Sequence, residues 1–595
     1  MRPEPAPTSA QGGSQLARRR LERLALALRQ RLRSSELWLI AFAILVGAAA
    51  GGATTLQGRL AHALQTAFYG VAAGERLSSS GPHWEVLFWL PAGGLILGVL
   101  AEVLRRRRSQ PLVDVVEANA LHGGRLGLAE SAIVCLQTVL SNGFGASVGL
   151  EAAYAQAGGV IASAAGAQLR LRRADLRVLV GAGAGAAIGA AFGAPLTGAF
   201  YAFEIVIGAY TPAALAPVAA ACLAGVLSAK AMGGLPYSIT VQAQPAPDAL
   251  AYLLYAALGL LCALFGVAMM QAVALIERWM RRAPLPAMTR PAIGGVLLAA
   301  LALGSPQTLS SGHGALHADL VDVTVMALAS ILVLKAAASI ISLAFGFRGG
   351  LFFASLFLGS LMGQLYARGL LALNLPAEIT ATNGALVGMG ALAAAIVGGP
   401  MTMSFLVLET TRDFGVAVAT LAAALLASTV VRERFGYSFS TWRLHLRGET
   451  IRSARDIGWA RSLTAGRMMR QDTATIAEGA TIEEFRRRFP LGSATRVILL
   501  DKSDRYAGLV VAAQAFEDSA KREAAVSDLR QSHDVSLRPD MNIEQVMRVF
   551  DAHGVEELAV VDDAGQLLGV LAENYVTRRY ARELEKRQRE VFGEA

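Results

Sequence analysis

Glu151 stands in the first third of the chain, at a point where a carboxylate can act on an anion site. It follows the glycine-rich stretch 141–149 and precedes a helix-compatible run, 152–157. Glycines let the backbone turn sharply, and the first amides of the helix that follows have no intrahelical acceptor. Such a helix start attracts anions. We therefore expect the Glu151 carboxylate to fill an anion site and to leave it when protonated; a simple helix cap is the alternative.

A second turn of the same kind lies in the second half of the chain. Gly349 and Gly350 release the backbone before Leu351 and Phe352, which begin an apolar helical run. The amides of Leu351 and Phe352 are predicted to point at the same anion as the Glu151 turn. A glycine-rich kink without a ligand is the alternative interpretation.

The two turns lie upstream of the two copies of an internal repeat. Residues 183–204 and 388–409 align with a constant offset of 205, since 388 − 183 and 409 − 204 agree, and nine of the 22 positions are identical. Matches of glycine and alanine can arise by chance in a chain rich in both. Four identical pairs are of other residue types: Pro195/Pro400, Thr197/Thr402, Phe200/Phe405 and Glu204/Glu409. Two halves with broken helices in matching places indicate a transporter whose site lies between the halves. The repeat alone does not distinguish inverted from parallel halves.

The surrounding chain has the composition of a polytopic membrane protein. Of its 595 residues, 54% are hydrophobic and 17% charged, and the mean hydropathy is +0.46. These values fall outside the range of soluble globular proteins. Apolar runs that can cross a lipid bilayer recur from Leu37 to about Val431. Several contain internal glycine or proline, so we expect broken as well as continuous helices.

Basic residues set the expected orientation. Arginines at 18–20 and 105–108 predict that these segments, and with them the N-terminus, lie on the cytoplasmic side. They also explain the net charge of +9 without a nucleic-acid partner. The first apolar run starts only at Leu37, which argues against a secretory signal peptide. The three cysteines lack metal-ligand spacing, and no P-loop or nucleophile–base pair is evident, so we expect no enzyme activity and no cofactor or metal site.

Beyond about residue 447 the chain changes character. Two strand–turn–strand patterns, 497–510 and 558–571, repeat with a spacing of 61 residues (569 − 508), and each follows a charged, helix-like stretch. They predict a small α/β pair. We therefore divide the chain into an N-terminal tail (1–36), a membrane domain (37–446) and two α/β units (462–520 and 525–585).

Taken together, the motifs resemble those of the CLC chloride channels and chloride/proton antiporters, followed by a pair of cytoplasmic CBS domains. The resemblance covers roughly residues 37–585. Its motifs are Gly149-Leu150-Glu151 with Gln156-Ala157-Gly158-Gly159, Gly193-Ala194-Pro195-Leu196 running to Glu204, Lys335 before Gly349-Gly350-Leu351-Phe352, and Gly388-Met389-Gly390-Ala391-Leu392 running to Glu409. It implies an α-helical polytopic fold of two inverted-repeat halves with broken helices. It also implies chloride or a similar small anion as substrate, protons as a second substrate in antiporters, and a homodimer with one pore per subunit.

The resemblance assigns roles to residues. Glu151 is similar to the external gating glutamate of the family, and the amides of Leu351 and Phe352 correspond to central anion ligands. The anion site that the resemblance implies comprises Gly149, Leu150, Glu151, Gly350, Leu351, Phe352 and Phe353.

This chain departs from the family at other ligand positions. The family motif Gly-Ser-Gly-Ile-Pro supplies a serine, but register from Pro111 places Arg108 at that position and Ser109 one residue further. The inner tyrosine of the family corresponds to Tyr437 or Phe439, and register favours Phe439. Ser109, Tyr437 and Phe439 are kept as candidate anion ligands. The threonine and aspartate that bind adenine nucleotides in CBS pairs are missing here, so we expect weak or absent ATP binding.

One departure concerns protons. The antiporters carry an internal glutamate next to the position of Glu204, and this chain has Ile205 there. We therefore expect a channel or a weakly coupled exchanger, with an antiporter that uses water or Glu204 as its proton path as the alternative.

A membrane-anchored CBS regulatory protein is less favoured, because a passive anchor needs no paired turns. A cation transporter would need more intramembrane carboxylates. The alanine- and arginine-rich composition favours a bacterial inner membrane, with both termini cytoplasmic.

Overall fold

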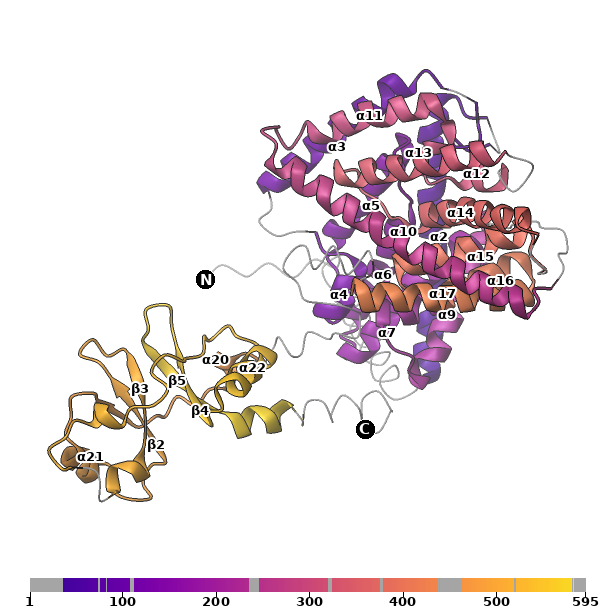
Figure 1. The fold of residues 1–595 in the computed structure, drawn as a ribbon. Helices are drawn as coiled ribbons and strands as arrows, with labels where there is room; N and C mark the ends of the chain where they lie inside the picture. Colours follow the sequence, from indigo (N-terminus) through magenta and orange to yellow (C-terminus); the bar gives the residue numbers. More distant parts are fainter. Residues whose placement is uncertain are drawn as a thin grey trace, which may run out of the picture. The chain divides into compact units, whose positions relative to one another are not determined.

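The chain folds as two compact units, Met1–Asp456 and Ile457–Ala595 (Figure 1). The computed structural model describes residues 36–72, 75–81, 83–107, 112–234, 246–318, 324–374, 378–436, 438, 463–517, 521–580 and 582. The first unit is helical, and the second combines short strands with helices.

The helical unit consists of two halves in which the same succession of helices occurs. The first half contains α2 (Glu36–Tyr69), α3 (Val86–Arg107), α4 (Val115–Leu121), α5 (Leu128–Gly143), α6 (Glu151–Gln168), α7 (Arg173–Phe192), α8 (Pro195–Tyr201), the π-helix η1 (Ala202–Ile207) and α9 (Pro212–Ala231). The second half contains α10 (Ala249–Arg282), α11 (Arg290–Gly304), the 3-10 turn η2 (Pro306–Thr308), α12 (His313–Ala318), α13 (Val325–Ala344), α14 (Phe352–Ala372), α15 (Ala381–Val397), α16 (Pro400–Thr411) and α17 (Phe414–Arg434). The long first helices α2 and α10 both have 34 residues, and α7 and α15 carry the start of the sequence repeat.

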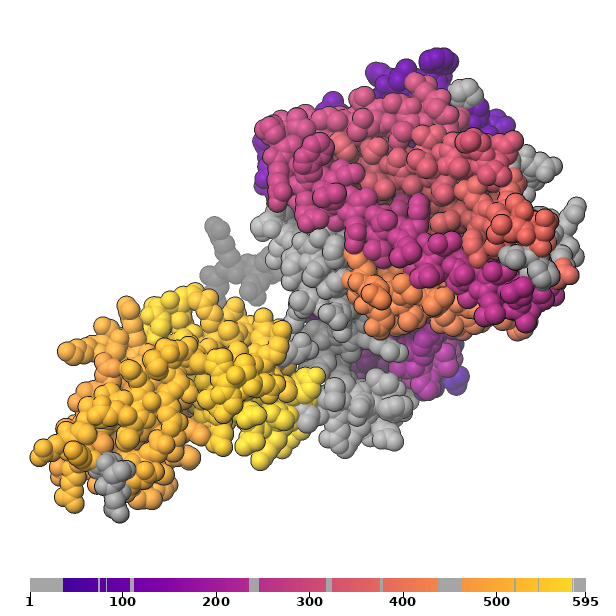
Figure 2. All heavy atoms as spheres, viewed as in Figure 1, coloured from indigo at the N-terminus to yellow at the C-terminus, as the bar shows by residue number. Residues whose placement is uncertain are grey.

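Seven of the described helices are long and apolar enough to cross a membrane, namely α2, α3, α7, α9, α10, α13 and α17. Their outer surfaces remain apolar. On α10, Leu253, Leu264 and Trp279 are 70%, 58% and 71% exposed, and this helix runs along the near face in Figure 2. Water disfavours such a surface, whereas lipid accepts it. The expected polytopic membrane fold is confirmed.

Glycines allow close helix crossings in equivalent places of the two halves. A Cβ atom at Gly158 on α6 would lie 2.1 Å from the carbonyl oxygen of Gly183 on α7. In the second half, a Cβ atom at Gly359 on α14 would lie 2.3 Å from the carbonyl oxygen of Gly388 on α15. Backbones can approach this closely only through residues without side chains. The glycine-rich composition is therefore a packing requirement.

The helices break where the sequence repeat predicts. α7 ends at Gly193 with φ 67°, and α15 ends at Gly398 with φ 93°, both in the left-handed region. A proline then opens the next helix, Pro195 in α8 and Pro400 in α16. Left-handed glycine stops a helix and proline suits a first turn. The break in each half places a new helix start inside the apolar unit.

The C-terminal unit contains two similar strand pairs. Its described elements are α20 (Ala465–Met468), β1 (Thr475–Ala477), α21 (Ile482–Arg488), β2 (Arg496–Leu500), β3 (Tyr506–Val511), η3 (Ala512–Phe516), η4 (Val526–Leu529), α22 (Ile543–His553), β4 (Glu557–Val561) and β5 (Leu567–Ala572). β2 pairs antiparallel with β3, and β4 with β5. The pairings shift register after Leu499 and Val560, which are 61 residues apart. The predicted α/β pair and its spacing are confirmed.

Candidate functional site

The two glycine-rich turns meet in the structure. The amide of Gly149 donates to the carbonyl of Gly350 at 2.9 Å, and the amide of Gly350 donates to the carbonyl of Gly149 at 3.2 Å. This bridge joins the residues just before α6 to those just before α14, so both helices start beside it. The two turns that the sequence singled out therefore form one centre between the halves.

Glu151 is the first residue of α6, and its side chain is 4% exposed. Its carboxylate lies over the Gly149 backbone, where an added Cβ would come within 1.8 Å of Oε2. The backbone amide of Phe353, in the first turn of α14, hydrogen-bonds to this carboxylate, whereas Oε2 has no partner. The carboxylate thus sits where the start of α14 would favour an anion. The sequence predicted that the amides of Leu351 and Phe352 would bind the anion. In the structure, the amide that contacts the Glu151 carboxylate is that of the next residue, Phe353.

Two cavities adjoin Glu151. The Arg59 cavity, about 630 Å³, is lined among others by Arg59, Arg76, Ser311 and His313. The Arg348 cavity, about 120 Å³, is lined among others by Asp114, Gln156, Tyr201, Ile205 and Arg348. Glu151 is the one described residue that lines both. Its buried carboxylate therefore separates two spaces that approach the same point.

The Arg59 cavity contains a histidine, His313, that the sequence analysis did not select. His313 begins α12, and its ring stacks on that of Phe353 with centroids 3.4 Å apart. The loop before it is held by the fully buried Lys335, whose Nζ donates to the carbonyls of Thr308 (3.2 Å) and Ser310 (2.8 Å). Lys335, noted in the sequence only as part of a motif, thus fixes the loop that brings His313 to the site.

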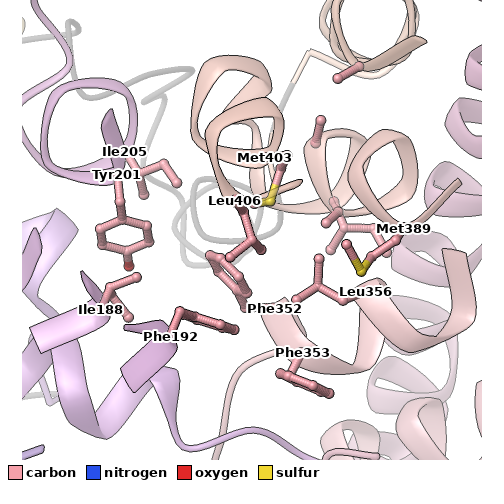
Figure 3. Close-up of a cluster of buried hydrophobic side chains, with 14 of the residues drawn as sticks. Ile188, Phe192, Tyr201, Ile205, Phe352, Phe353, Leu356, Met389, Met403 and Leu406 are labelled. Atoms are coloured by element: carbon pink, nitrogen blue, oxygen red, sulfur yellow. The ribbon is translucent and has the colours of Figure 1, made fainter. Parts of the chain in front are cut away.

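The Arg348 cavity contains two further residues that sequence reasoning did not select, Tyr201 and Arg348. Tyr201 lies at the end of α8, 7% exposed, with its ring 6.2 Å from that of Phe352 between centroids. Figure 3 shows Tyr201 and Ile205 on the same helical segment, facing the aromatic group that contains Phe192 and Phe352. Ile205 is therefore a wall residue of the cavity beside Glu151. Tyr201 could have been found from the sequence, because it lies four residues before Ile205 and residues with this spacing share one face of a helix.

Glu204 and Glu409 cap helices of the opposite half. Glu409 accepts hydrogen bonds from the amide of Leu196 (2.9 Å) and from the amide and hydroxyl of Thr197 (2.8 and 2.7 Å), at the start of α8. Glu204 accepts in the same way from the amide and hydroxyl of Thr402 (2.8 and 2.7 Å), at the start of α16. A carboxylate at a helix N-terminus satisfies amides that have no other acceptor. We name these four groups, Glu204 with Thr402 and Glu409 with Thr197, the carboxylate clamp.

Other contacts across the halves are reciprocal too. Phe200 stacks on Phe405, its counterpart in the repeat, with centroids 4.3 Å apart and planes at 9°. Gly149 and Gly350 exchange hydrogen bonds in both directions. When residue i meets j and j meets i, the two parts are related by a two-fold axis. The sequence repeat therefore corresponds to a pseudo-two-fold arrangement, with the Glu151 centre between the halves.

The remaining predicted ligands, Ser109, Tyr437 and Phe439, lie outside the described residues. Leu150, Leu351 and Phe352 are buried beside the bridge, with 8%, 2% and 4% exposure. In the described part of the chain no three histidine, cysteine or acidic side chains gather as a metal site.

Comparison with known proteins agrees with this geometry. The sequence profile of the family "Voltage gated chloride channel" matches residues 93–432, and that of the CBS domain matches residues 526–582. A ClcB-like chloride channel protein of Ralstonia nicotianae is 30% identical over 400 residues, covering 65% of this chain and 92% of the relative. The voltage-gated ClC-type chloride channel ClcB of Escherichia coli O81 is 28% identical over 362 residues, covering 59% and 84%.

Solved structures share the fold. A slow cyanobacterial Cl⁻/H⁺ antiporter superposes with a TM-score of 0.59 at 22% identity, covering 69% of this chain and 97% of the other. A eukaryotic CLC transporter superposes with a TM-score of 0.57 at 18% identity, covering 93% and 98%. With its apolar spans, paired turns and matching profile, the chain is a multi-pass integral membrane protein that belongs to the voltage-gated chloride channel (CLC) family and carries a C-terminal CBS pair.

Proposed function

We propose that this chain carries chloride or a similarly small anion across the membrane, along a path that the Glu151 carboxylate gates. The observation that carries the proposal is that Glu151 alone, among the described residues, lines both cavities. An anion passing between them must displace the carboxylate from the start of α14. The names of the relatives, chloride channel and Cl⁻/H⁺ antiporter, agree with this substrate.

The test is flux through purified protein in liposomes with a chloride gradient. We expect the wild type to release chloride, and Glu151→Ala to release it faster and without dependence on pH, because no carboxyl group remains to close the path. Glu433→Ala, an exposed glutamate at the end of α17, serves as the control. No chloride release by either wild type or Glu151→Ala would contradict the proposal.

Channel-like transport is the form of the activity that we favour. Ile205, which carries no proton, lines the Arg348 cavity. The neighbouring Glu204 caps α16 through Thr402 and is not among the residues that line this cavity. Recording external pH together with chloride separates the two forms. Chloride release without proton movement agrees with a channel, and uphill proton movement contradicts it.

One observation favours proton-coupled exchange as the second candidate. Asp114 lines the same cavity as Glu151 and Tyr201, and so places a second carboxylate there. Its Oδ1 accepts the amide of Glu117 at 2.8 Å as the cap of α4. If the exchanger form holds, Asp114→Asn is expected to abolish proton movement while chloride still passes. Proton movement that persists in this variant would exclude Asp114.

We also propose that the protein works as a homodimer in a bacterial inner membrane with both termini in the cytoplasm. The arginine runs at 18–20 and 105–108 support this orientation. A monomeric mass in detergent, or labelling of the termini from the outside of intact cells, would contradict these proposals.

A further inference from the structure

Arg348 occupies the turn that leads into the anion centre. It lies two residues before Gly350, whose backbone forms the bridge with Gly149. Its amide donates to the Ser141 hydroxyl at 3.0 Å, and its Nη1 donates to the Gln137 side-chain oxygen at 3.3 Å. Both acceptors are on α5. The backbone and the guanidinium of Arg348 are thus each tied to one helix beside the site.

Arg348 is the one cation among the described residues that line the Arg348 cavity. The other charged groups in that lining are the carboxylates of Asp114 and Glu151. Asp114 caps α4, and Glu151, the first residue of α6, places its carboxylate against the start of α14. A guanidinium stays charged at any ordinary pH and offers five donors. The cavity therefore combines a permanent positive charge with the amides at the start of α14.

A small anion loses much of its hydration when it enters a space of about 120 Å³. That loss costs several kcal/mol unless fixed donors replace the water. The amides at the start of α14 supply some of these donors, but Glu151 holds that position in this structure. An anion that arrives before Glu151 moves needs another partner, and Arg348 is placed to be that partner.

We propose that the Arg348 guanidinium binds the transported anion in the Arg348 cavity, before the anion displaces Glu151 from the start of α14. This inference rests on the proposed function and names a residue of the path that the anion takes. It also separates two roles: Arg348 attracts the anion, and Glu151 decides whether the anion passes.

The experiment compares Arg348→Gln and Arg348→Lys with wild type as full-length protein in liposomes, at several chloride concentrations. Charge-assisted hydrogen bonds contribute about 1.5–3 kcal/mol, so Arg348→Gln is expected to raise the half-saturating chloride concentration roughly tenfold or more. Arg348→Lys keeps the charge and is expected to show a smaller rise. Arg282→Gln, exposed at the end of α10, is the matched control and should behave as wild type.

The same substitutions in the Glu151→Ala background distinguish direct binding from an effect on the gate. If Arg348 binds the anion, Arg348→Gln raises the half-saturating concentration by a similar factor in both backgrounds. If the effect disappears without the Glu151 carboxylate, Arg348 acts only as a counter-ion to Glu151, and the inference is overturned. An unchanged half-saturating concentration in both backgrounds overturns it as well.

Calorimetric titration of the detergent-purified proteins with chloride separates this inference from the proposed function. If the wild type moves no chloride but Arg348→Gln binds chloride more weakly than the wild type, the transport proposal is refuted and the anion site at Arg348 is supported. Unaltered binding in a protein that does transport chloride would refute the role of Arg348. If Arg348→Gln does not fold, Gln137→Leu removes the acceptor that orients the guanidinium, and a two- to threefold weaker binding is expected; unaltered binding there counts against the inference.

Discussion

Gly149→Ala is expected to open the anion path at neutral pH while leaving the fold intact. The three atoms nearest to a Cβ at this position all belong to the Glu151 carboxyl group, at 1.8, 2.6 and 2.7 Å. The carboxyl group is the flexible end of a side chain, so it moves and the backbone does not. A contact this short costs more than the ~1.4 kcal/mol that shifts an equilibrium tenfold. Chloride flux should therefore rise roughly tenfold toward that of Glu151→Ala.

Gly369→Ala is the matched control for this experiment. It lies on α14 away from the anion site, where a Cβ would meet no atom within 4 Å. We expect its flux to stay near that of wild type. A Gly149→Ala protein with the flux and pH dependence of wild type would show that the carboxylate does not rest over Gly149 when the path is closed.

Glu409→Ala is expected to lower the free energy of unfolding of the helical unit by roughly 3 kcal/mol. The substitution removes the acceptor of three hydrogen bonds of 2.7–2.9 Å from Leu196 and Thr197. Hydrogen bonds to a charged group contribute about 1.5–3 kcal/mol each, and the total is smaller than their sum because the Leu196 amide is exposed and the Thr197 amide only partly buried. The measurement is thermal unfolding in detergent, where Tm should fall by several degrees.

The carboxylate clamp offers its own controls. Glu409→Gln keeps one acceptor oxygen and should lose less stability than Glu409→Ala. Glu204→Ala removes the equivalent contacts with Met401 and Thr402 (3.1, 2.8 and 2.7 Å) and should lower Tm by a comparable amount. If Glu409→Ala lowers Tm and Glu204→Ala leaves it unchanged, the two glutamates do not stabilise the opposite halves equally, and the reciprocal role is contradicted.

Much of the architecture could be predicted because its signals are local. Broken helices in matching places of the two halves were predicted, and the glycine and proline of each copy account for the breaks at Gly193 and Gly398. The starts of α6 at Glu151 and of α14 at Phe352 follow from their glycine-rich turns. The strand pairs of the C-terminal unit follow from alternation and turn residues. In each case a few adjacent residues decide the backbone conformation.

The site residues that were missed depend on which elements face each other. Arg348 and Tyr201 reach the same cavity from segments far apart in the chain, and no short pattern reports that. His313 was missed because its helix, α12, has only six residues, too few to show a periodic pattern in the sequence. The role of Glu204 and Glu409 had a usable signal, since Thr197/Thr402 and Glu204/Glu409 coincide in the repeat. The structure explains this coincidence, because each glutamate hydrogen-bonds to the threonine of the other half.

The carboxylate clamp also constrains how the sequence can diverge. Each glutamate holds a helix start in the other half, through a threonine found at the matching place of the repeat. We therefore expect a substitution of Glu204 to be compensated at Thr402, and one of Glu409 at Thr197, rather than within its own half. Related sequences should show covariation between positions 204 and 402 and between 197 and 409. Two copies of an ancestral segment that arose by duplication would then have remained dependent on each other, so neither half could evolve as an independent domain.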